Sequence, residues 1–164
     1  MPGENAWEVR PAQRADATAV NDLLVQLGYQ QDGPTATAER IRAWAEEPAN
    51  AVWVATGDSD LLGIIAVHVC PFFERAGSWG RITALVVSER ARCRGVGSAL
   101  VAAAEAFAVT HGCLRMEVTT ADHRHDARAF YRHCGYLDQA GTSSRFLRDL
   151  VGSDGRPDPL RTER

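Results

Sequence analysis

The sequence predicts an α/β (α+β) fold in which a mixed β-sheet of six to seven strands is flanked by four helices. Short β-rich runs alternate apolar and polar residues, and the segments between several of them repeat apolar residues at helical spacing. The order of these elements is βααβββαβαββ, which places helices on the faces of one sheet. A chain of 164 residues with 45% hydrophobic residues suits one domain with a real core. We therefore expect a single domain over residues 1–150.

The first half of the chain is expected to begin with the strand "AWEVRPA", followed by two helices. Asp16 is a candidate cap for the first helix, which ends at Gly28 and repeats its apolar residues at helical spacing. Thr37 is the candidate N-cap of the second helix, "AERIRAWAEE". The runs at 51–57 and 61–69 have the composition of strands, and the turn residues "GDSD" between them predict a hairpin.

The second half of the chain continues the alternation of strands and helices. Residues 81–87 are expected to form a strand, and the helix after it ends at His111 and Gly112. The remaining expected elements are a strand at 113–120, a short helix at 126–135 and a final hairpin of 136–141 with 143–150. This hairpin would complete the sheet.

Composition excludes several classes of protein. The formal net charge of −3 argues against a general nucleic-acid binder, which needs an excess of Lys and Arg to displace counterions. The four cysteines form no C-x-x-C pair, so we expect reduced thiols and no metal site: Cys70, Cys93, Cys113 and Cys134. No signal pattern opens the chain, and the longest apolar run is too short for a bilayer. We expect a cytoplasmic protein with no membrane partner and a flexible C-terminal tail at 151–164.

The stretch "SERARCRGVGSAL" joins a strand to the following helix and has the features of an anion site. A helix N-terminus exposes unpaired amides and the positive end of the helix dipole, and both attract phosphate. Gly95 and Gly97 leave room for oxygens to approach the amides of residues 94–98. Arg92 and Arg94 can add charge-assisted hydrogen bonds. The stretch therefore predicts a site for a phosphorylated ligand.

Two other phosphate-binding motifs do not fit this stretch. A dinucleotide-binding fingerprint needs its glycines directly after the strand, but seven residues intervene and Leu100 stands where the third glycine is required. A Walker-type phosphate loop needs Gly-Lys-Ser/Thr, which the sequence lacks. One alternative stays open, since the two glycines also suit a tight strand-to-helix turn with solvated arginines.

Two motifs, in this order, resemble those of the GNAT superfamily of N-acetyltransferases. The stretch "RCRGVGSAL" matches the superfamily's Q/R-x-x-G-x-G/A motif through Arg92, Gly95 and Gly97. The stretch "DARAFYRHCGY" resembles its later A-x-x-F-Y-x-x-x-G-F/Y segment through Ala127, Phe130, Tyr131, Gly135 and Tyr136. The resemblance covers about residues 7–150. It implies that the sheet splays open beside the strand at 81–87.

The resemblance implies that acetyl-CoA, or a related acyl-CoA, is the cofactor and that a primary amine takes its acyl group by direct attack. The pantetheine arm would run beside the strand at 81–87, where the amide of Val86 or Val87 would stabilise the oxyanion. The pyrophosphate would rest on the amides from Cys93 to Ser98. The cofactor-binding residues implied in this way are Leu85, Val86, Val87, Arg92, Cys93, Arg94, Gly95, Val96, Gly97 and Ser98.

Tyr131 matches the general-acid tyrosine of the superfamily. A tyrosine has a reference pKa near 10 and a thiol one near 8.5, so a proton would pass from Tyr131 to the departing thiolate at a modest cost. The alternative is a purely structural residue, because Tyr131 has aromatic neighbours in Phe130 and Tyr136 with which it can pack.

The general base departs from the superfamily pattern. Many relatives carry an acidic residue on the strand where this chain has Thr83. Removing the proton of a lysine-like amine at pH 7 costs about 5 kcal/mol, so a base or a chain of water molecules is needed. The candidates are His68, Glu74 and Glu117, besides water. The sequence leaves these alternatives open.

The acceptor pocket is implied to lie near the first two helices, the loop between them and the final hairpin. Candidates for its apolar wall and its negative charge are Tyr29, Phe72, Phe73, Trp79, Asp32, Glu74 and Asp138. A small amine is favoured as acceptor over a peptide or protein amine. The alternative function is a non-catalytic acyl-CoA-binding module that regulates a partner. Apolar edges and the final hairpin are compatible with a homodimer.

Overall fold

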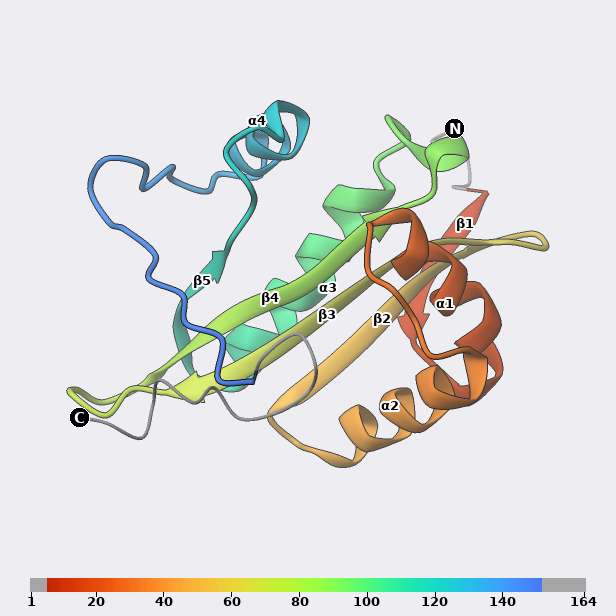
Figure 1. The fold of residues 1–164 in the computed structure, drawn as a ribbon, viewed down its shortest axis with the longest axis horizontal. Helices are drawn as coiled ribbons and strands as arrows, with labels where there is room; N and C mark the ends of the chain where they lie inside the picture. Colours follow the sequence, from red (N-terminus) through yellow and green to blue (C-terminus); the bar gives the residue numbers. More distant parts are fainter. Residues whose placement is uncertain (1–5, 152–164) are drawn as a thin grey trace.

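The computed structural model describes residues 6–151, which form a five-stranded sheet with helices on both faces (Figure 1). The strands are β1 (Trp7–Pro11), β2 (Asn50–Gly57), β3 (Leu61–Pro71), β4 (Ser78–Val87) and β5 (Cys113–Val118). The helices are α1 (Ala17–Gln26), α2 (Pro34–Glu46), α3 (Val96–Thr110) and α4 (His125–His133), with short 3₁₀ turns η1 (Arg14–Asp16) and η2 (Glu89–Ala91). The predicted α+β class, mixed sheet and four helices are confirmed.

The sheet is mixed because its last pair of strands is parallel. β1 to β4 pair antiparallel in sequence order, whereas β5 runs parallel to β4 after the crossover through α3. The predicted hairpin at "GDSD" joins β2 to β3, and the Gly57 amide donates to the Asp60 carbonyl oxygen at 2.8 Å. α3 ends where it was predicted to end, with His111 as its C-cap and Gly112 in the left-handed region.

Alternate residues of the central strands divide the core between the two faces of the sheet. Ile64 and Val86 belong to a cluster with the buried residues of α1 and α2. Ile65 and Ile82 belong to a cluster with Leu100 and its neighbours on α3. α1 and α2 therefore cover one face and α3 covers the other, as Figure 1 shows.

The two predicted helix caps differ from the structure for local reasons. Asp16 stands at the N-cap of α1, but its side chain makes no cap bond, because Arg10 and the Gln13 amide occupy its carboxylate. α2 begins earlier than predicted, at Pro34, and Thr37 lies buried inside it. Proline suits the first helical turn, since its missing amide hydrogen has no helical partner to lose there.

The final hairpin predicted over residues 136–150 is not formed, which corrects the expected six to seven strands to five in the described residues. The hydrogen bonds of Asp138 stabilise a turn at this point. Its carboxylate accepts hydrogen bonds from Arg128 and Arg132 of α4 and from the Ala140 amide. A turn therefore replaces the first strand of the predicted hairpin.

Apolar side chains on both sides of this turn are exposed to solvent: Leu137 before it to 84%, and Phe146 and Leu147 after it to 94% and 73%. A strand needs a neighbouring backbone and a covered apolar face, and this segment gains neither. The homodimer expected from such surfaces stays a prediction. The predicted tail at 151–164 lies outside the described residues, apart from Val151.

Three further findings concern residues 6–151. None of their helices has both the length and the hydropathy needed to cross a bilayer. No group of three or more His, Cys, Asp or Glu side chains is placed to hold a metal ion in this part of the chain. The four cysteines are free thiols.

A bidentate ion pair ties β1 to the start of α1. The Arg10 guanidinium donates to both carboxylate oxygens of Asp16, each at 2.8 Å, and the Gln13 amide donates to one of them at 2.7 Å. The Asp16 side chain is only 11% exposed. The hydrogen bonds from Arg10, assisted by that from the Gln13 amide, lower the pKa of the Asp16 carboxyl below its ordinary value, against the opposing effect of burial.

We predict that Asp16→Asn lowers the free energy of unfolding at pH 7 by about 1–3 kcal/mol. A carboxyl whose pKa is depressed by folding stabilises the protein above its unfolded pKa of about 3.9, and this contribution fades as the pH falls towards the folded pKa. Urea unfolding at pH 7 and pH 3 should therefore show a smaller difference from wild type at pH 3. Asp22→Asn, on the exposed side of α1, is the control and should change little. An equal loss at both pH values contradicts the role of the charge.

Candidate active site

β4 bends at a bulge in its middle. Ala84 pairs with Ala66 and Ile82 with Val67, so Thr83 is an extra residue on β4. The Thr83 hydroxyl donates to the Ala66 carbonyl oxygen at 3.3 Å. β5 pairs with β4 only as far as Ile82. Beyond Ile82 the two parallel strands diverge, and a V-shaped gap opens beside the second half of β4 (Figure 1).

The main chain of β4 leaves hydrogen-bonding groups free along this gap. The Ser88 amide donates to the Leu62 carbonyl oxygen at 2.8 Å, which shows that residue 88 faces β3. Alternate residues of a strand direct their main-chain groups to the same side, so Val86 also faces β3. Leu85 and Val87 then direct their amides and carbonyls into the gap. This edge of β4 can pair with an extended ligand.

The end of the turn between β4 and α3 (residues 92–98) has an unusual backbone, and we refer to it as the phosphate turn. Cys93 and Gly95 are in the left-handed region, with φ values of 59° and 79°. The first helical hydrogen bond of α3 runs from the Ala99 amide to the Gly95 carbonyl oxygen at 3.1 Å. Among the described residues, no main-chain acceptor is bonded to any amide of residues 93–98. Such a nest of amides at a helix N-terminus binds anions.

The three arginines of this region have different surroundings. Arg90 forms an ion pair with Asp60 at 3.4 Å, across the end of the β2–β3 hairpin. Arg92 and Arg94 are exposed, and neither has an ion pair with a described residue. Two guanidinium groups beside the phosphate turn are therefore available to a ligand.

α4 packs beside the phosphate turn, beyond the end of β5 (Figure 1). A Cβ at Gly97 would lie 3.1 Å from two ring carbons of Phe130 and 3.5 Å from Cγ2 of Val87. Gly97 thus serves the packing of α4 as well as the access to the turn that the sequence suggested. The following residue, Tyr131, packs against the core cluster that includes Val96 and Leu100 of α3.

Tyr131 lies in an aromatic cluster of three side chains. Its ring centroid is 5.2 Å from that of Phe130 and 5.7 Å from that of Tyr136. Burial raises the pKa of the Tyr131 hydroxyl to about 12, although the positive charge of Arg124 opposes the rise. The packing of Tyr131 with its aromatic neighbours is thus observed, and its role as a general acid stays a prediction.

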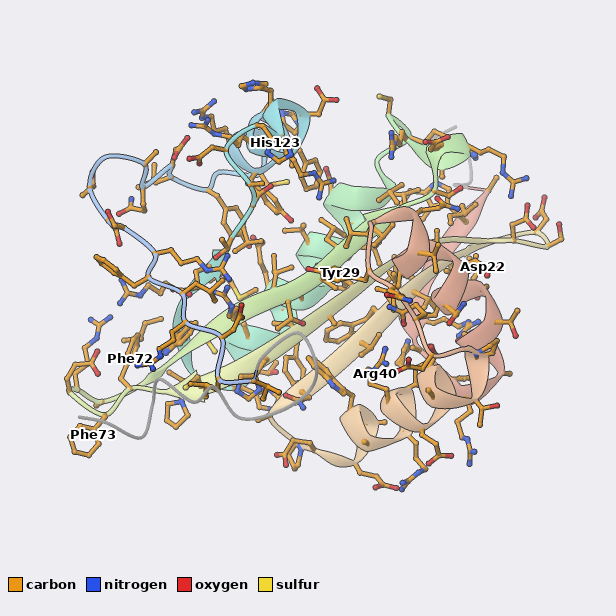
Figure 2. All side chains as sticks on the ribbon, viewed as in Figure 1. Asp22, Tyr29, Arg40, Phe72, Phe73 and His123 are labelled. Carbon is orange, nitrogen blue, oxygen red and sulfur yellow. The ribbon has the colours of Figure 1, made fainter. Side chains whose placement is uncertain are left out.

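On the other face of the sheet, a cavity of about 300 Å³ lies between α1, α2 and the strands β2 to β4, the α-face cavity. It reaches Thr83 and Ala84 at the bulge of β4, where the gap begins. Figure 2 shows Tyr29 above the middle of the sheet and Arg40 beside α2. Its lining residues are Val20, Leu24, Tyr29, Gln30, Gln31, Thr37, Arg40, Ile41, Trp44, Val52, Ile64, Ala66, Thr83 and Ala84.

A larger hollow, of about 1390 Å³, lies between β5, α4 and the segment after α4. Tyr131 borders it, together with Arg81 and Glu117. No final hairpin narrows this hollow, because the described chain after α4 forms no further strand. The α-face cavity, in contrast, reaches Thr83 and Ala84, at the bulge where β4 and β5 part.

The residues proposed as general base are not gathered at the α-face cavity. His68 is on the same face, where its ring is hydrogen-bonded to the Asn50 side chain, but it does not line the cavity. Glu117 forms an ion pair with Arg81 at 2.7 Å. Glu74 is exposed in the loop between β3 and β4. No carboxylate lines this cavity.

Of the candidates for the acceptor pocket, only Tyr29 lines the α-face cavity. Figure 2 shows Phe72 and Phe73 at the far end of the sheet, and Phe73 is fully exposed. Asp138 is occupied by Arg128 and Arg132 at 2.7 and 2.6 Å. Apart from Tyr29, these residues are therefore not gathered at the α-face cavity, and the predicted acceptor pocket stays a prediction.

Sequence reasoning missed the contribution of α2 to this cavity. Thr37, Arg40, Ile41 and Trp44 line it, at positions i, i+3, i+4 and i+7 of one helical face. That spacing was visible in the sequence. The sequence analysis placed the pocket near the first two helices, but none of the residues that it named as candidates lies on α2.

Comparison with known proteins shows what the chain resembles. Residues 18–136 match the acetyltransferase (GNAT) family. Glucosamine 6-phosphate N-acetyltransferase 1 of Oryza sativa subsp. japonica is 28% identical over 143 residues, covering 82% of this chain and 83% of the relative. Aminoalkylphosphonate N-acetyltransferase of Salmonella typhimurium is 30% identical over 129 residues, covering 79% and 84%. Among solved structures, glucosamine-6-phosphate N-acetyltransferase from Arabidopsis thaliana superimposes with a TM-score of 0.74 at 18% identity, covering 87% and 99%.

We predict that Gly97→Ala destabilises the protein by about 1–2 kcal/mol, because the added methyl group meets the Phe130 ring. The smaller side chain of Phe130→Leu should relieve this clash. The double variant should therefore be more stable than the sum of the two single effects allows. Urea unfolding of the four proteins measures this coupling, and strictly additive losses would show that the contact does not limit the position of α4.

Proposed function

The chain belongs to the acetyltransferase (GNAT) family and is an acetyl-CoA-dependent N-acetyltransferase, and we propose that it acetylates a small primary amine by direct attack. The observation that carries this proposal is the gap between β4 and β5. The phosphate turn follows β4 at one end of this gap, Tyr131 lines the hollow beside β5, and the α-face cavity reaches β4 at Thr83 and Ala84, where the pairing with β5 has ended. One site therefore offers places for an acyl donor and for an amine.

The residues of the phosphate turn fit the diphosphate of acetyl-CoA. Left-handed Cys93 and Gly95 turn neighbouring amides to one side, and no atom lies within 4 Å of the place where a Cβ of Gly95 would be. Arg92 and Arg94 are free to approach the same anion. With acetyl-CoA bound, the thioester supplies an activated acetyl group. The amides from Cys93 through Gly95, Val96 and Gly97 to Ser98 would hold its diphosphate.

The exposed edge of β4 would orient the extended arm of the same molecule. Leu85 and Val87 would form its main-chain hydrogen bonds, while Val86 holds the strand to the core with its buried side chain. Of the two amides considered as oxyanion donors, that of Val87 points into the gap and that of Val86 towards β3. This direction supports Val87 as the donor.

Tyr131 would act chiefly as a hydrogen-bond donor to the departing sulfur. Transfer of a proton from a group with a pKa of about 12 to the anion of a thiol with a pKa of about 8.5 costs about 5 kcal/mol. This cost is larger than the reference values suggested. A hydroxyl that keeps its proton still stabilises a thiolate by donating to it, and that is the role that the burial of Tyr131 supports.

The surroundings of the α-face cavity support water as the acceptor of the amine proton. An amine with a pKa of about 10.4 loses its proton at pH 7 at a cost of about 5 kcal/mol. The carboxylate of Glu117 is held by Arg81, and His68 is held by Asn50 outside the cavity. Neither Glu74 nor another carboxylate lies at the amine's position.

Two observations support a small acceptor. The α-face cavity has a volume of about 300 Å³, at the lower end of the range for small-molecule sites. The two curated relatives are named for small amines, glucosamine 6-phosphate and an aminoalkylphosphonate. The alternative, a non-catalytic acyl-CoA-binding module, would need no such cavity beside the gap.

The direct test of the proposal is release of thiol from acetyl-CoA in the presence of a panel of small primary amines. A thermal-shift measurement with coenzyme A alone accompanies it. Amine-dependent thiol release supports the acetyltransferase. Stabilisation by coenzyme A without turnover of any amine supports the binding module instead.

We predict that Arg92→Ala and Arg94→Ala each weaken coenzyme A binding by about tenfold, since each removes a charge-assisted hydrogen bond to phosphate. Arg90→Ala is the matched control, because Arg90 is already paired with Asp60. Isothermal titration with coenzyme A should show a change below about threefold for this variant. Equal losses for all three variants would point to a general positive field rather than to a diphosphate site.

We predict that Tyr131→Phe lowers kcat by about 10–100-fold with little change in the KM for acetyl-CoA, because it removes a hydrogen bond made to developing charge. Tyr136→Phe is the matched control from the same cluster. The Tyr136 hydroxyl is buried near Glu105 and has no part in the proposed reaction, so its loss should leave kcat within about threefold. Steady-state kinetics of both variants distinguishes a catalytic hydroxyl from a packing role.

A further inference from the structure

We propose that the acceptor is a monoamine on an apolar carbon skeleton and that Arg40 discriminates against acceptors with a second positive charge. The proposal rests on the proposed function, since it assigns the substrate class of the same site. It concerns the end of the α-face cavity away from the reacting amine. The side chains at this end determine which chemical groups the rest of the acceptor molecule can have.

The walls of this cavity are mostly hydrocarbon. α1 contributes Val20 and Leu24, α2 contributes Ile41 and Trp44, and the sheet contributes Val52 and Ile64. Val20, Ile41 and Ile64 are also buried members of the core cluster under α1 and α2, so these walls are fixed in place. Transfer of an apolar carbon skeleton from water to such walls is favourable in free energy. A hydroxylated or charged skeleton would lose its hydrogen bonds to water there, which is unfavourable.

Among residues 6–151, Arg40 is the only one with a charged side chain that lines the cavity. It donates one hydrogen bond, to Oε1 of Gln31 at 3.2 Å, and forms no ion pair with a described residue. The nearest acidic residue in sequence, Glu39, is occupied by Arg14 and Arg42 at 2.8 and 3.0 Å. The positive charge of Arg40 is therefore uncompensated at the cavity and repels a second cation on the acceptor.

The chemistry of this lining separates three kinds of amine. A polyamine or an aminoglycoside would bring further ammonium groups against Arg40 and among aliphatic side chains. An arylalkylamine would place only its ring there. An amine with a distant carboxylate would place the anion where the guanidinium can donate to it.

The test compares three acceptors with the same four-carbon reach in the thiol-release assay with the full-length protein. The acceptors are 4-phenylbutylamine, 4-aminobutyrate and 1,4-diaminobutane. We expect kcat/KM for 4-phenylbutylamine to exceed that for 1,4-diaminobutane by at least about tenfold. The kcat/KM for 4-aminobutyrate should also be higher than that for the diamine. A diamine that matches or exceeds the arylalkylamine overturns the inference and leaves the acetyltransferase assignment intact.

Arg40→Glu tests whether this residue carries the discrimination. We expect the ratio of kcat/KM for 1,4-diaminobutane over 4-aminobutyrate to rise by at least about tenfold in this variant. Arg42→Gln is the matched control on α2, because Arg42 pairs with Glu39 and Glu46 and does not line the cavity. Its ratio should stay within about twofold of wild type. An unchanged ratio in Arg40→Glu, in a protein that still binds coenzyme A, overturns the role of Arg40.

A separate outcome bears on the proposed function. If coenzyme A binds but thiol is released with neither these three amines nor a wider amine panel, the proposed acetylation of a small amine is contradicted. If other amines are acetylated and only the arylalkylamine is refused, the apolar acceptor alone fails. The two failures are thus distinguishable with one assay.

Discussion

The site depends on one constraint, which is that β4 and β5 stop pairing after Ile82. The extra residue Thr83 bends β4, and the parallel ladder to β5 does not continue past it. A strand that loses its neighbour keeps unpaired amides and carbonyls, and these are costly in a protein interior unless another partner takes them. Beyond Ile82, β4 lacks the hydrogen bonds of a continued ladder with β5, and an extended ligand could pair with its free backbone groups instead. The phosphate turn, α4 and the α-face cavity all converge on this place.

The parts of the site that local sequence determines could be predicted. The phosphate turn is a short stretch of backbone whose shape depends on Gly95 and on its place before a helix, and the aromatic pair at Phe130 and Tyr131 is likewise local. The acceptor walls come from α1, α2 and three strands, so they depend on how distant segments pack. The prediction of a final hairpin was wrong for a similar reason. The alternating pattern could not reveal that Asp138 is bound by two arginines of α4.

The environment of Tyr131 shows why reference values alone mislead. The sequence identified the residue, but its pKa depends on the aromatic neighbours and on the core that bury it. The same burial that makes the hydroxyl a poor acid excludes water around it, and hydrogen bonds to charge are stronger where water is excluded. The role that we propose for Tyr131 is therefore that of a hydrogen-bond donor that stabilises charge without giving up its proton.

The contact between Gly97 and Phe130 also restricts how such a chain can change over evolutionary time. Position 97 belongs to the diphosphate region and position 130 to the helix that carries Tyr131, and the missing Cβ of one makes room for the ring of the other. A lineage could acquire a larger residue at 97 with little loss only after position 130 had become smaller. The order of these two substitutions is therefore fixed by volume, and descendants should inherit the two positions as a pair.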